Sequence, residues 1–355
     1  MAIRSAAASE AREENEKMLK REDIERREKE YLSEFACASV DSRGRVLNEE
    51  PCGFRTDFQR DRDRIIHSKA FRRLMHKTQV FLSPEGDHFR TRLTHTLEVA
   101  QISRTVARGL GLNEDLTEAI ALGHDLGHTP FGHIGEAVLN EIHPGGFRHN
   151  IQSQRVVDLL EGNNGLNGRG LNLTYEVRDG IRNHSGSDIP FTLEGQVVRI
   201  CDRVAYINHD IDDAIRSGVI SLDDLPKECL KVLGKTHGTR VDTLVSDLIH
   251  ESDGKPTVLQ SDECREAMGE LRQYMFSNVY HSDKVKRSED LARVTEVVTT
   301  LYRYYLEHPD ELPEDMLKLA DEYGNAETVK DFVACMTDHY AMELYDTIVL
   351  GGKRQ

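Results

Sequence analysis

Residues 121–136 read ALGHDLGHTPFGHIGE, with an aspartate directly after the first of three histidines. The adjacent pair His124-Asp125 lies between two further candidate ligands, His95 upstream and Asp202 downstream. Two imidazoles and two carboxylates form a mixed nitrogen and oxygen set that suits a divalent ion of the Mn, Fe, Co or Mg kind. Such an ion can polarise a phosphoryl oxygen or lower the pKa of a bound water. The sequence therefore predicts a metal site on these four residues.

A single histidine is more often a hydrogen-bonded core residue than a metal ligand. Here, however, seven of the sixteen histidines fall within residues 88–149. His124 and His128 are four residues apart, so they would share one face if a helix continued through both. Ligands from different helices that meet in a helical core are a known way to build such a site. The concentration of histidines thus favours a metal site.

Composition is typical of a soluble cytoplasmic enzyme. Of the 355 residues, 38% are hydrophobic and 30% are charged. The sequence contains no apolar run near the ~18 residues of a membrane span, and residues 1–10 lack the apolar stretch of a secretory signal. The six cysteines are scattered without a C-x-x-C pair, which predicts reduced thiols. A net charge of −16 argues against stable binding of double-stranded nucleic acid.

A basic segment precedes the first candidate ligand. Residues 55–92 contain ten Lys and Arg against five Asp and Glu, a local net charge of +5. Arginine binds phosphate oxygens bidentately, so such a segment suits a polyphosphate substrate. The alternative is a solvated helix face in which charges four residues apart form ion pairs. The sequence alone leaves both interpretations open.

Apolar spacing predicts a mostly helical chain without sustained strand alternation. The segment 10–34 is highly charged and is expected to be an exposed helix or a mobile arm, and 37–57 to be irregular. One helix is expected to begin at Phe58, and a second to run from an N-cap at Thr94 to Gly111. Further helices are expected from Asn113 to the His124-Asp125 pair, from a turn at 129–133 to Ile142, and from Thr192 to Gly218. A loop is expected at 162–170, and helical patterns recur at Val294–His308 and Glu327–Ile348.

The helix expected after Thr192 carries a polar stripe. Asp202, Tyr206 and Asp210 are spaced at i, i+4 and i+8, so they line one face. Two carboxylates and a phenol in a row are poor core residues and suit the wall of a polar pocket. The alternative is a stripe that faces solvent.

Longer motifs carry a family resemblance. They are RDRDRIIHSKAFRRLMHKTQVF at 60–81, RTRLTH at 90–95, GHTPFGHIGE at 127–136, FRHNIQS at 147–153 and CDRVAYINHD at 201–210. These motifs resemble the HD-domain metal-dependent phosphohydrolases, and among them the dGTPase-like deoxynucleotide triphosphohydrolases of bacteria. The resemblance implies an all-α, irregular helical HD fold. A catalytic core at 55–220 would follow a charged arm and irregular segment at 1–54, and a C-terminal helical region at 221–355 would pack on the core.

The resemblance also implies roles for single residues. His133 and Glu136 match the family's catalytic pair, and a spacing of three would put both on one helix face. A carboxylate that orients an imidazole suits acid–base chemistry. His184 is a candidate for the lining of the tunnel that would hold the substrate, but the resemblance gives it no role. The positions expected to contact substrate are Gln79, Arg92, His128, His149, Arg203, Tyr206 and Asp210.

Within that set, the two histidines and the two arginines match positions near the phosphates. Some relatives have Lys in place of Arg203, so the match is weaker at this position. Gln79 and Tyr206 match residues that bracket the sugar, where a filled pocket excludes a ribose 2′-hydroxyl. The resemblance therefore implies a substrate that is a deoxynucleotide with several phosphates.

The implied reaction is attack of water on the α-phosphorus of a dNTP, which releases the deoxynucleoside and inorganic triphosphate. The expected cofactor is Mn²⁺, Mg²⁺ or Co²⁺, with Fe or Zn as alternatives. Expected partners are the dNTP substrate, a second dNTP as activator and further copies of the chain in a dimer-based oligomer, without a membrane. The rival hypotheses are an HD phosphohydrolase that acts on nucleoside monophosphates or cyclic nucleotides, and a nucleotide-sensing or single-strand-binding module with a vestigial site.

Overall fold

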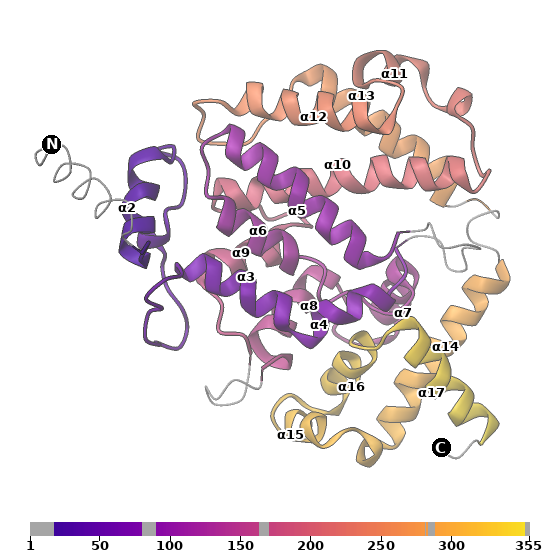
Figure 1. The fold of residues 1–355 in the computed structure, drawn as a ribbon. Helices are drawn as coiled ribbons and strands as arrows, with labels where there is room; N and C mark the ends of the chain where they lie inside the picture. The colour runs from indigo at the N-terminus through magenta and orange to yellow at the C-terminus, as the bar shows by residue number, and fades with distance from the viewer. Residues whose placement is uncertain (1–17, 80–89, 163–169, 281, 283–287, 352–355) are drawn as a thin grey trace, which may run out of the picture.

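The computed structural model describes residues 18–79, 90–162, 170–280, 282 and 288–351. Every regular element in these residues is helical, as Figure 1 shows. Extended pairing among them is limited to two isolated bridges, Arg45 with Thr174 and Thr78 with Thr91. The prediction of an all-α fold is confirmed.

The centre of the molecule is formed by helices that lie between residues 57 and 216 (Figure 1). They are α3 (Asp57–His67), α4 (Lys69–Arg73), α5 (Arg92–Gly109), α6 (Glu114–Gly123), α7 (Gly132–Ile142), α8 (His149–Arg155), α9 (Tyr175–Asn183) and α10 (Leu193–Arg216), with a π-helical turn at Val156–Leu160 after α8. Helices α5, α6 and α10 pack on one another in the middle.

Side-chain caps fix where these helices begin. The Asn113 side chain accepts hydrogen bonds from the amides of Asp115 and Leu116, so α6 begins as the sequence predicted. Thr192 caps α10 in the same way, also as predicted. The predicted cap of α5 was wrong by one turn. Thr91 rather than Thr94 is the cap, since the Thr91 hydroxyl accepts from the Thr94 amide at 3.4 Å.

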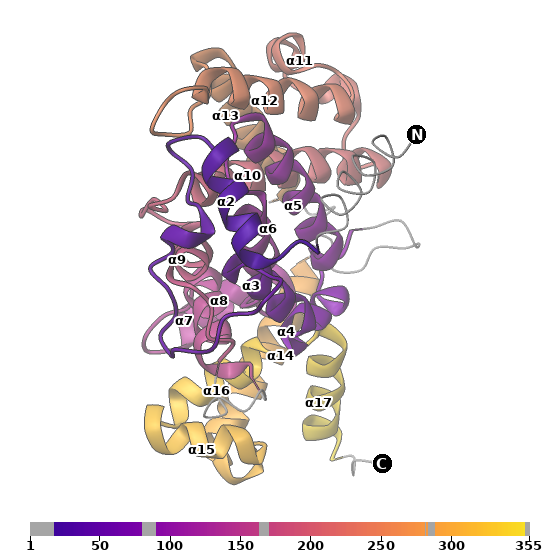
Figure 2. The ribbon, with the colours of Figure 1, turned by 60° about the vertical axis from the view of Figure 1, so that its left-hand side comes forward.

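The helices after residue 220 form two separate groups. One group is α11 (Lys227–Leu233), α12 (His237–Ser252) and α13 (Asp262–Met275), followed by a π-helical turn at Phe276–Tyr280. The other is α14 (Ser288–Glu307), α15 (Glu314–Tyr323), α16 (Asn325–Ala334) and α17 (Asp338–Leu350). The two groups lie at opposite ends of the central helices in both ribbon views (Figures 1 and 2).

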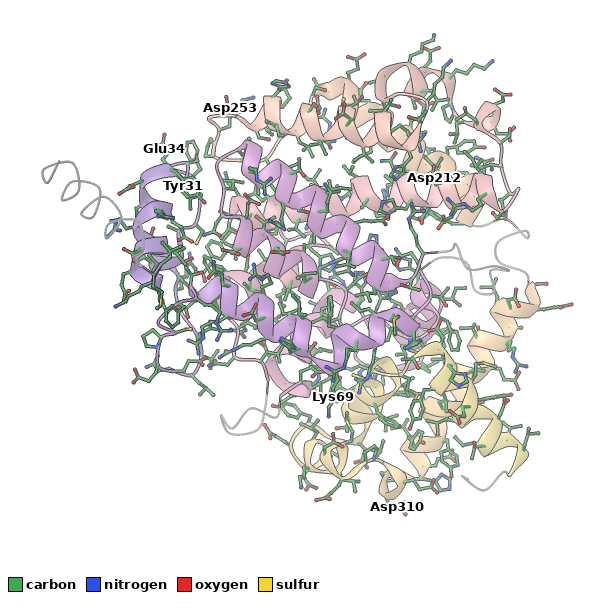
Figure 3. All side chains as sticks on the ribbon, in the orientation of Figure 1. Tyr31, Glu34, Lys69, Asp212, Asp253 and Asp310 are labelled. Carbon is green, nitrogen blue, oxygen red and sulfur yellow. The ribbon has the colours of Figure 1, made fainter. Side chains whose placement is uncertain are left out.

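The two groups belong to different hydrophobic cores. Buried residues of α11–α13 join the core of α3, α5, α6 and α10. Buried residues of α14, α16 and α17 instead pack with Phe131, Ile134 and Phe147 around α7. Figure 3 shows side chains filling the space between the helices, with Asp253 at the end of the α12 group and Asp310 at the end of the other. The helix with His133 and Glu136 therefore packs against the C-terminal group.

Other expectations are met in part. Helix α2 (Arg21–Tyr31) lies in the expected exposed arm, but its Glu28 is buried and accepts from the Ser39 amide at 2.7 Å. The pattern at Glu327–Ile348 was predicted as one helix and is split, because α16 ends at Ala334 and α17 begins at Asp338. Most of the predicted loop at 162–170 lies outside the described residues. No helix in the described part of the chain has the length and apolarity that a membrane span requires.

Candidate metal centre and active site

The His124-Asp125 pair lies in a tight turn directly after α6. That turn packs so closely on α8 that a Cβ added to Gly127 would lie 2.1 Å from the Ser153 amide nitrogen. Only glycine permits such a close approach of two backbones. The Gly127 amide also donates to the Ser153 hydroxyl at 2.9 Å. Gly127 therefore allows the turn that carries His124 and Asp125 to pack against α8.

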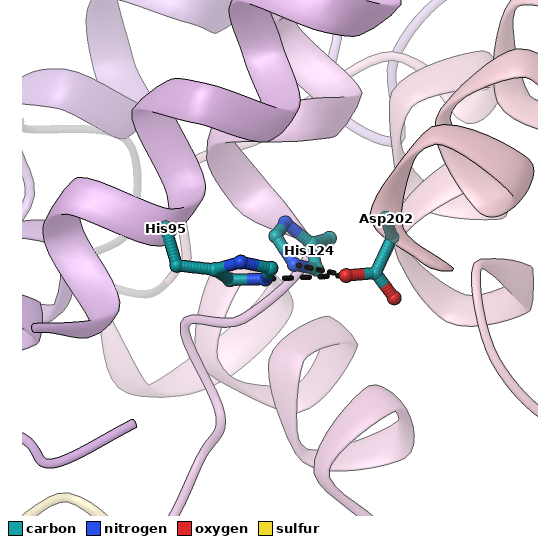
Figure 4. Close-up of side chains that lie close together, drawn as sticks. All are labelled: His95, His124 and Asp202. Atoms are coloured by element: carbon teal, nitrogen blue, oxygen red, sulfur yellow. Dashed lines mark hydrogen bonds and ion pairs between the residues drawn. The ribbon is translucent and has the colours of Figure 1, made fainter. Parts of the chain in front are cut away.

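The predicted metal ligands converge from three elements (Figure 4). His95 comes from α5, Asp202 from α10, and His124 from the turn between them. The Nε2 atoms of His95 and His124 lie 3.2 and 3.7 Å from the same Asp202 Oδ1. Asp125 is the fourth predicted ligand, and its Oδ1 lies 3.5 Å from His124 Nε2. The ligand atoms of His95, His124 and Asp202 are near enough to share one ion.

The hydrogen bonding of His124 supports this assignment. Its Nδ1 lies 2.7 Å from the Ala121 carbonyl oxygen, which can only accept, so Nδ1 carries the proton. In the neutral ring Nε2 then has a lone pair. That atom is buried and has no hydrogen-bond partner among the described residues. A buried lone pair aimed at two carboxylates fits a divalent ion.

The carboxylates of the cluster are held in their charged form. Burial alone would raise the pKa of Asp125, but His124 and the Arg92 guanidinium outweigh it and hold that pKa well below its ordinary value. Burial also opposes the charged form of Asp202, and the hydrogen bond from His95 outweighs it, so the pKa of Asp202 is lowered as well. Both carboxylates are therefore in the anionic form that a divalent ion would require of them.

Arg92 connects this cluster to the cavity. Its Nη1 donates to Asp125 Oδ2 at 2.7 Å, and the side chain is almost completely buried. Its Nε and Nη2 have no hydrogen-bond partner among the described residues. A buried guanidinium with free donors in a cavity wall suits an oxyanion.

Glu136 contacts two imidazoles at once. Its Oε2 lies 3.2 Å from His133 Nδ1, and its Oε1 lies 2.9 Å from His149 Nδ1. Burial alone would raise the pKa of Glu136, but His149 and His133 outweigh it and lower that pKa. Burial opposes the charged form of His149, and Glu136 in turn raises the pKa of that ring. His149 and Glu136 therefore form an ion pair, and His133 shares its carboxylate.

Two more histidines lie beside that pair. The His128 ring stacks on His149 with centroids 4.4 Å apart, and burial together with Arg92 keeps the pKa of His128 well below its ordinary value. His184 Nε2 lies 3.2 Å from His149 Nε2, and its ring centroid lies 5.0 Å from that of His124. Burial lowers the pKa of His184 to about 3. His184 is thus a neutral ring that lies between His124 of the candidate metal site and the His149–Glu136 ion pair.

The cavity beside the cluster has a volume of about 340 Å³. Its walls include Tyr206 and Asp210 of α10. The Tyr280 hydroxyl donates to Asp210, and Arg272 Nε donates to the Tyr206 hydroxyl at 3.0 Å. Burial raises the pKa of Asp210 to about 7 against the effect of the Tyr280 hydrogen bond. This wall therefore combines a phenol with a carboxyl that titrates near neutral pH.

Comparison with known proteins agrees with this geometry. The family model described as HD domain matches residues 92–207, and the one described as Phosphohydrolase-associated domain matches residues 258–347. A curated protein of Caldanaerobacter subterraneus subsp. tengcongensis is 59% identical over 93% of this chain and 96% of its own length. One from Desulfatibacillum aliphaticivorans is 49% identical over 92% of this chain and 97% of its own. Both are named deoxyguanosinetriphosphate triphosphohydrolase-like protein.

The chain belongs to this dGTPase-like family of HD-domain phosphohydrolases. Among solved structures, a phosphohydrolase from Bacteroides thetaiotaomicron is similar with a TM-score of 0.49 and 18% identity, over 79% of this chain and 67% of that one. The HD model spans the four predicted metal ligands. The associated-domain model covers most of α14–α17 and also α13, which contributes Arg272 to the cavity wall.

Most residues that the dGTPase-like resemblance marked lie around this one cavity. His124 and Glu136 do not line it but contact residues that do. Arg203 is also absent from its walls, so the structure does not place this arginine beside the expected phosphates. The helix does not continue from His124 to His128, because α6 ends at Gly123. The predicted residues that do line the cavity are Gln79, Arg92, His95, Asp125, His128, His133, His149, Asp202, Tyr206 and Asp210.

The basic segment at 55–92 is mostly structural. Arg64 donates to Glu49, and Arg62 donates to Asp115 at 2.7 Å. Arg55, Arg60 and Arg90 also form ion pairs with carboxylates. Of the ten basic residues in this segment, all of which the structure describes, Arg92 is the one that lines the cavity. Ion pairs therefore account for Arg55, Arg60, Arg62, Arg64 and Arg90, but their partners are not the residues four positions away that the alternative expected. The phosphate interpretation is left to Arg92.

Three cavity residues beyond the HD core were not predicted from the sequence. Arg272, Phe276 and Tyr280 line the cavity from α13 and the π-helical turn after it. Their spacing at i, i+4 and i+8 matches that of the stripe on α10, so the same criterion would have found them. Nothing local in the sequence indicated that this second stripe faces the first.

Proposed function

We propose that this phosphohydrolase converts deoxynucleoside triphosphates, dGTP or dNTPs in general, to the deoxynucleoside and inorganic triphosphate. The names of the relatives support the substrate class. The observation that carries the proposal is that one cavity combines metal-ligand carboxylates, the free donors of Arg92 and the His133 ring. A simple binding module would not need all three.

The phosphate end of the substrate belongs beside Arg92. A divalent ion on His95, His124, Asp125 and Asp202 would supply Lewis-acid polarisation of a phosphoryl oxygen and a bound water of lowered pKa. Arg92 already donates to Asp125 and offers its remaining donors to a non-bridging oxygen. In the reaction the water oxygen bonds to the α-phosphorus, the bond from that phosphorus to the 5′-oxygen breaks, and the 5′-oxygen takes up a proton.

Proton transfer is assigned to His133. Its Nδ1 faces Glu136, so its Nε2 is the ring atom left to exchange a proton with the reacting groups. Glu136 keeps the ring oriented, and the contact with His149 keeps Glu136 charged. His149 and His128 would lie beside the phosphates, where a charged His149 adds to the field of Arg92.

The sugar end is assigned to Gln79, Tyr206 and Asp210. Gln79 Oε1 is buried without a hydrogen-bond partner among the described residues, which suits a sugar hydroxyl as donor. Tyr206 and Asp210 are held by Arg272 and Tyr280, so their positions are fixed before substrate arrives. A wall fixed in this way can exclude an additional 2′-hydroxyl.

The test is incubation of the pure protein with each dNTP and each rNTP plus Mn²⁺ or Mg²⁺, followed by chromatography of the products. The expected products are deoxynucleoside and triphosphate. In ¹⁸O-water the label should enter triphosphate, because water adds to the α-phosphorus. Orthophosphate from monophosphates would favour the rival phosphohydrolase hypothesis. Tight nucleotide binding without any product would favour the sensing module.

A further inference from the structure

Asp338, the first residue of α17, bridges two distant segments of the HD core. Its Oδ1 accepts from the Phe131 amide at 2.9 Å, and its Oδ2 accepts from the Thr78 amide at 2.9 Å. The Thr78 hydroxyl donates to the same Oδ2. These partners are 207 and 260 residues away along the chain. A single carboxylate of the C-terminal group therefore joins two walls of the cavity, since Thr78 and Phe131 both line it.

The carboxylate is not needed to cap its own helix. Thr337 is the N-cap of α17, and its hydroxyl accepts from the Tyr340 amide at 3.2 Å. With that role filled by Thr337, both Asp338 oxygens are available to the HD core.

The Phe131 contact holds an unfavourable backbone conformation. Phe131 has φ of 61°, a left-handed value that costs free energy in any residue except glycine. It precedes α7 directly and provides no side-chain cap for that helix. Because His133 lies two residues further on, the direction of this turn sets where its ring points. The Asp338 contact therefore acts on the orientation of the proposed acid–base residue.

The Thr78 contact holds the other of these two walls, which carries Gln79 and Arg92. Thr78 forms the isolated bridge with Thr91, the N-cap of the helix that begins at Arg92, and it precedes Gln79. The two walls are in close contact, because a Cβ on Gly132 would lie 3.0 Å from both the Gln79 carbonyl oxygen and Arg92 Nη2. Small displacements of one wall would therefore change its distance from the other.

A second contact between the same parts lies beside the first. The fully buried Lys77 ammonium donates to the carbonyl oxygen of His128 and, at 2.9 Å, to that of Ala334 at the end of α16. The connection between α16 and α17 thus holds the segment before Gln79 and the turn before His133 by two polar contacts.

We propose that Asp338 is a positioning residue that aligns His133 with the phosphate- and sugar-contacting wall of the cavity. This proposal rests on the proposed function, because it assigns the alignment to dNTP hydrolysis. The described hydrogen bonds of Asp338 reach no substrate-contacting side chain and no metal ligand, so its effect on turnover passes through the Phe131 and Thr78 backbones. The C-terminal group then completes the active site rather than only covering it.

The test compares Asp338→Asn with a matched control, Asp262→Asn. Asp262 is likewise the first residue of its helix, follows a capping Ser261, and makes its ion pair only three residues away, with Arg265 at 2.6 Å. An amide in place of the Asp338 carboxylate has one acceptor fewer, so kcat for dNTP hydrolysis should fall about tenfold or more while KM changes little. Metal content should equal wild type. The control should retain turnover within about twofold.

Hydrogen exchange gives a readout that does not depend on activity. In Asp338→Asn, peptides that contain Thr78 and Phe131 should exchange faster, and peptides from the middle of α16 should not. If the wild type hydrolysed no dNTP while these peptides still lost protection, the proposed function would be overturned and the bridge would stand. Unchanged exchange at both sites, or turnover within about twofold of wild type, would overturn the positioning role. If Asp338→Asn does not fold, Thr78→Val decides by the same two criteria, because it removes the hydroxyl contact alone.

Discussion

His124 shows how one backbone contact decides the chemistry of a side chain. The Ala121 carbonyl accepts from Nδ1 and so turns the lone pair of Nε2 toward Asp125 and Asp202. The carboxylates remain charged despite their burial. A site built in this way is ready to bind a divalent ion before the ion arrives.

Replacing either residue of the pair should therefore remove the ion. In His124→Ala or Asp125→Ala, three remaining ligands hold it poorly, so bound metal and hydrolysis should both be lost. The helical circular dichroism should stay close to wild type, since both residues lie in a turn. Elemental analysis measures the metal, and full occupancy in both variants would show that the ligand assignment is wrong.

The Glu136 contacts lead to a different prediction. His133→Ala and Glu136→Ala should lower turnover by ~10²–10⁴-fold, the range for loss of a general acid or base. Metal content should stay near wild type, because neither residue contacts the four ligands. Glu136→Ala should be the more severe change, since it also leaves His149 without its carboxylate. Turnover within about twofold of wild type in either variant would remove that residue from the mechanism.

At the scale of elements, Glu194 joins three segments at the start of α10. Its Oε1 accepts from the amides of Asn113 and Cys37 at 3.0 Å each, so it connects the cap of α6 and the segment after α2. Burial raises the pKa of Glu194 to about 7, although these two amides act against the rise. Asp125 differs, because the Arg92 guanidinium holds that carboxyl in the charged form.

This raised pKa predicts a loss of stability with rising pH. The folded protein keeps a proton that a carboxyl in the unfolded chain releases near pH ~4.3. The stabilisation is therefore complete below that pH and is lost as the pH rises through about 7. The Glu194→Gln side chain cannot ionise, so this variant does not lose that stabilisation. Its free energy of unfolding, measured relative to that of wild type, should therefore increase between about pH 5 and about pH 8. Urea denaturation at both pH values measures the difference.

The matched control is Glu34→Gln, because Glu34 lies at the edge of the molecule beside Tyr31 (Figure 3). Its difference from wild type should not change with pH. An equal pH response in wild type and Glu194→Gln would contradict the proposed protonation.

At the scale of the whole molecule, the helices outside the HD core make two different contributions. Those of α11–α13 extend the main core and bring Arg272 and Tyr280 to the cavity. Those of α14–α17 pack on α7 and bring Asp338 to its N-terminal turn. Neither group is a separate appendage, since each supplies contacts to the walls of the same cavity.

We also expect the chain to form a dimer-based homo-oligomer. Closed symmetric assemblies are usual for soluble enzymes, and the helices outside the core offer surface for such contacts. Light scattering at micromolar concentration should give at least twice the chain mass of 40.3 kDa. A mass equal to the single chain would exclude the oligomer. Activation by a second dNTP predicts that the rate for one dNTP rises when another is added, and unchanged rates for every pair would exclude it.

The sequence by itself determined the helical class, the caps at Asn113 and Thr192 and the four candidate metal ligands. These features depend on local spacing and on side chains next to the backbone that they cap, so they are present in the order of residues. The i, i+4, i+8 stripe at Asp202 was also visible for this reason. The family resemblance then added the His133–Glu136 pair, whose contact the structure contains.

The tertiary structure alone decided which of these groups act together. The contact of Glu136 with His149, the pairing of the basic residues before Arg92, the absence of Arg203 from the cavity walls and the reach of Asp338 to Phe131 all depend on packing. Such contacts join residues up to 260 positions apart, as in the Asp338 contact with Thr78. No local pattern specifies them, because they form only when whole helices have buried their apolar faces against one another.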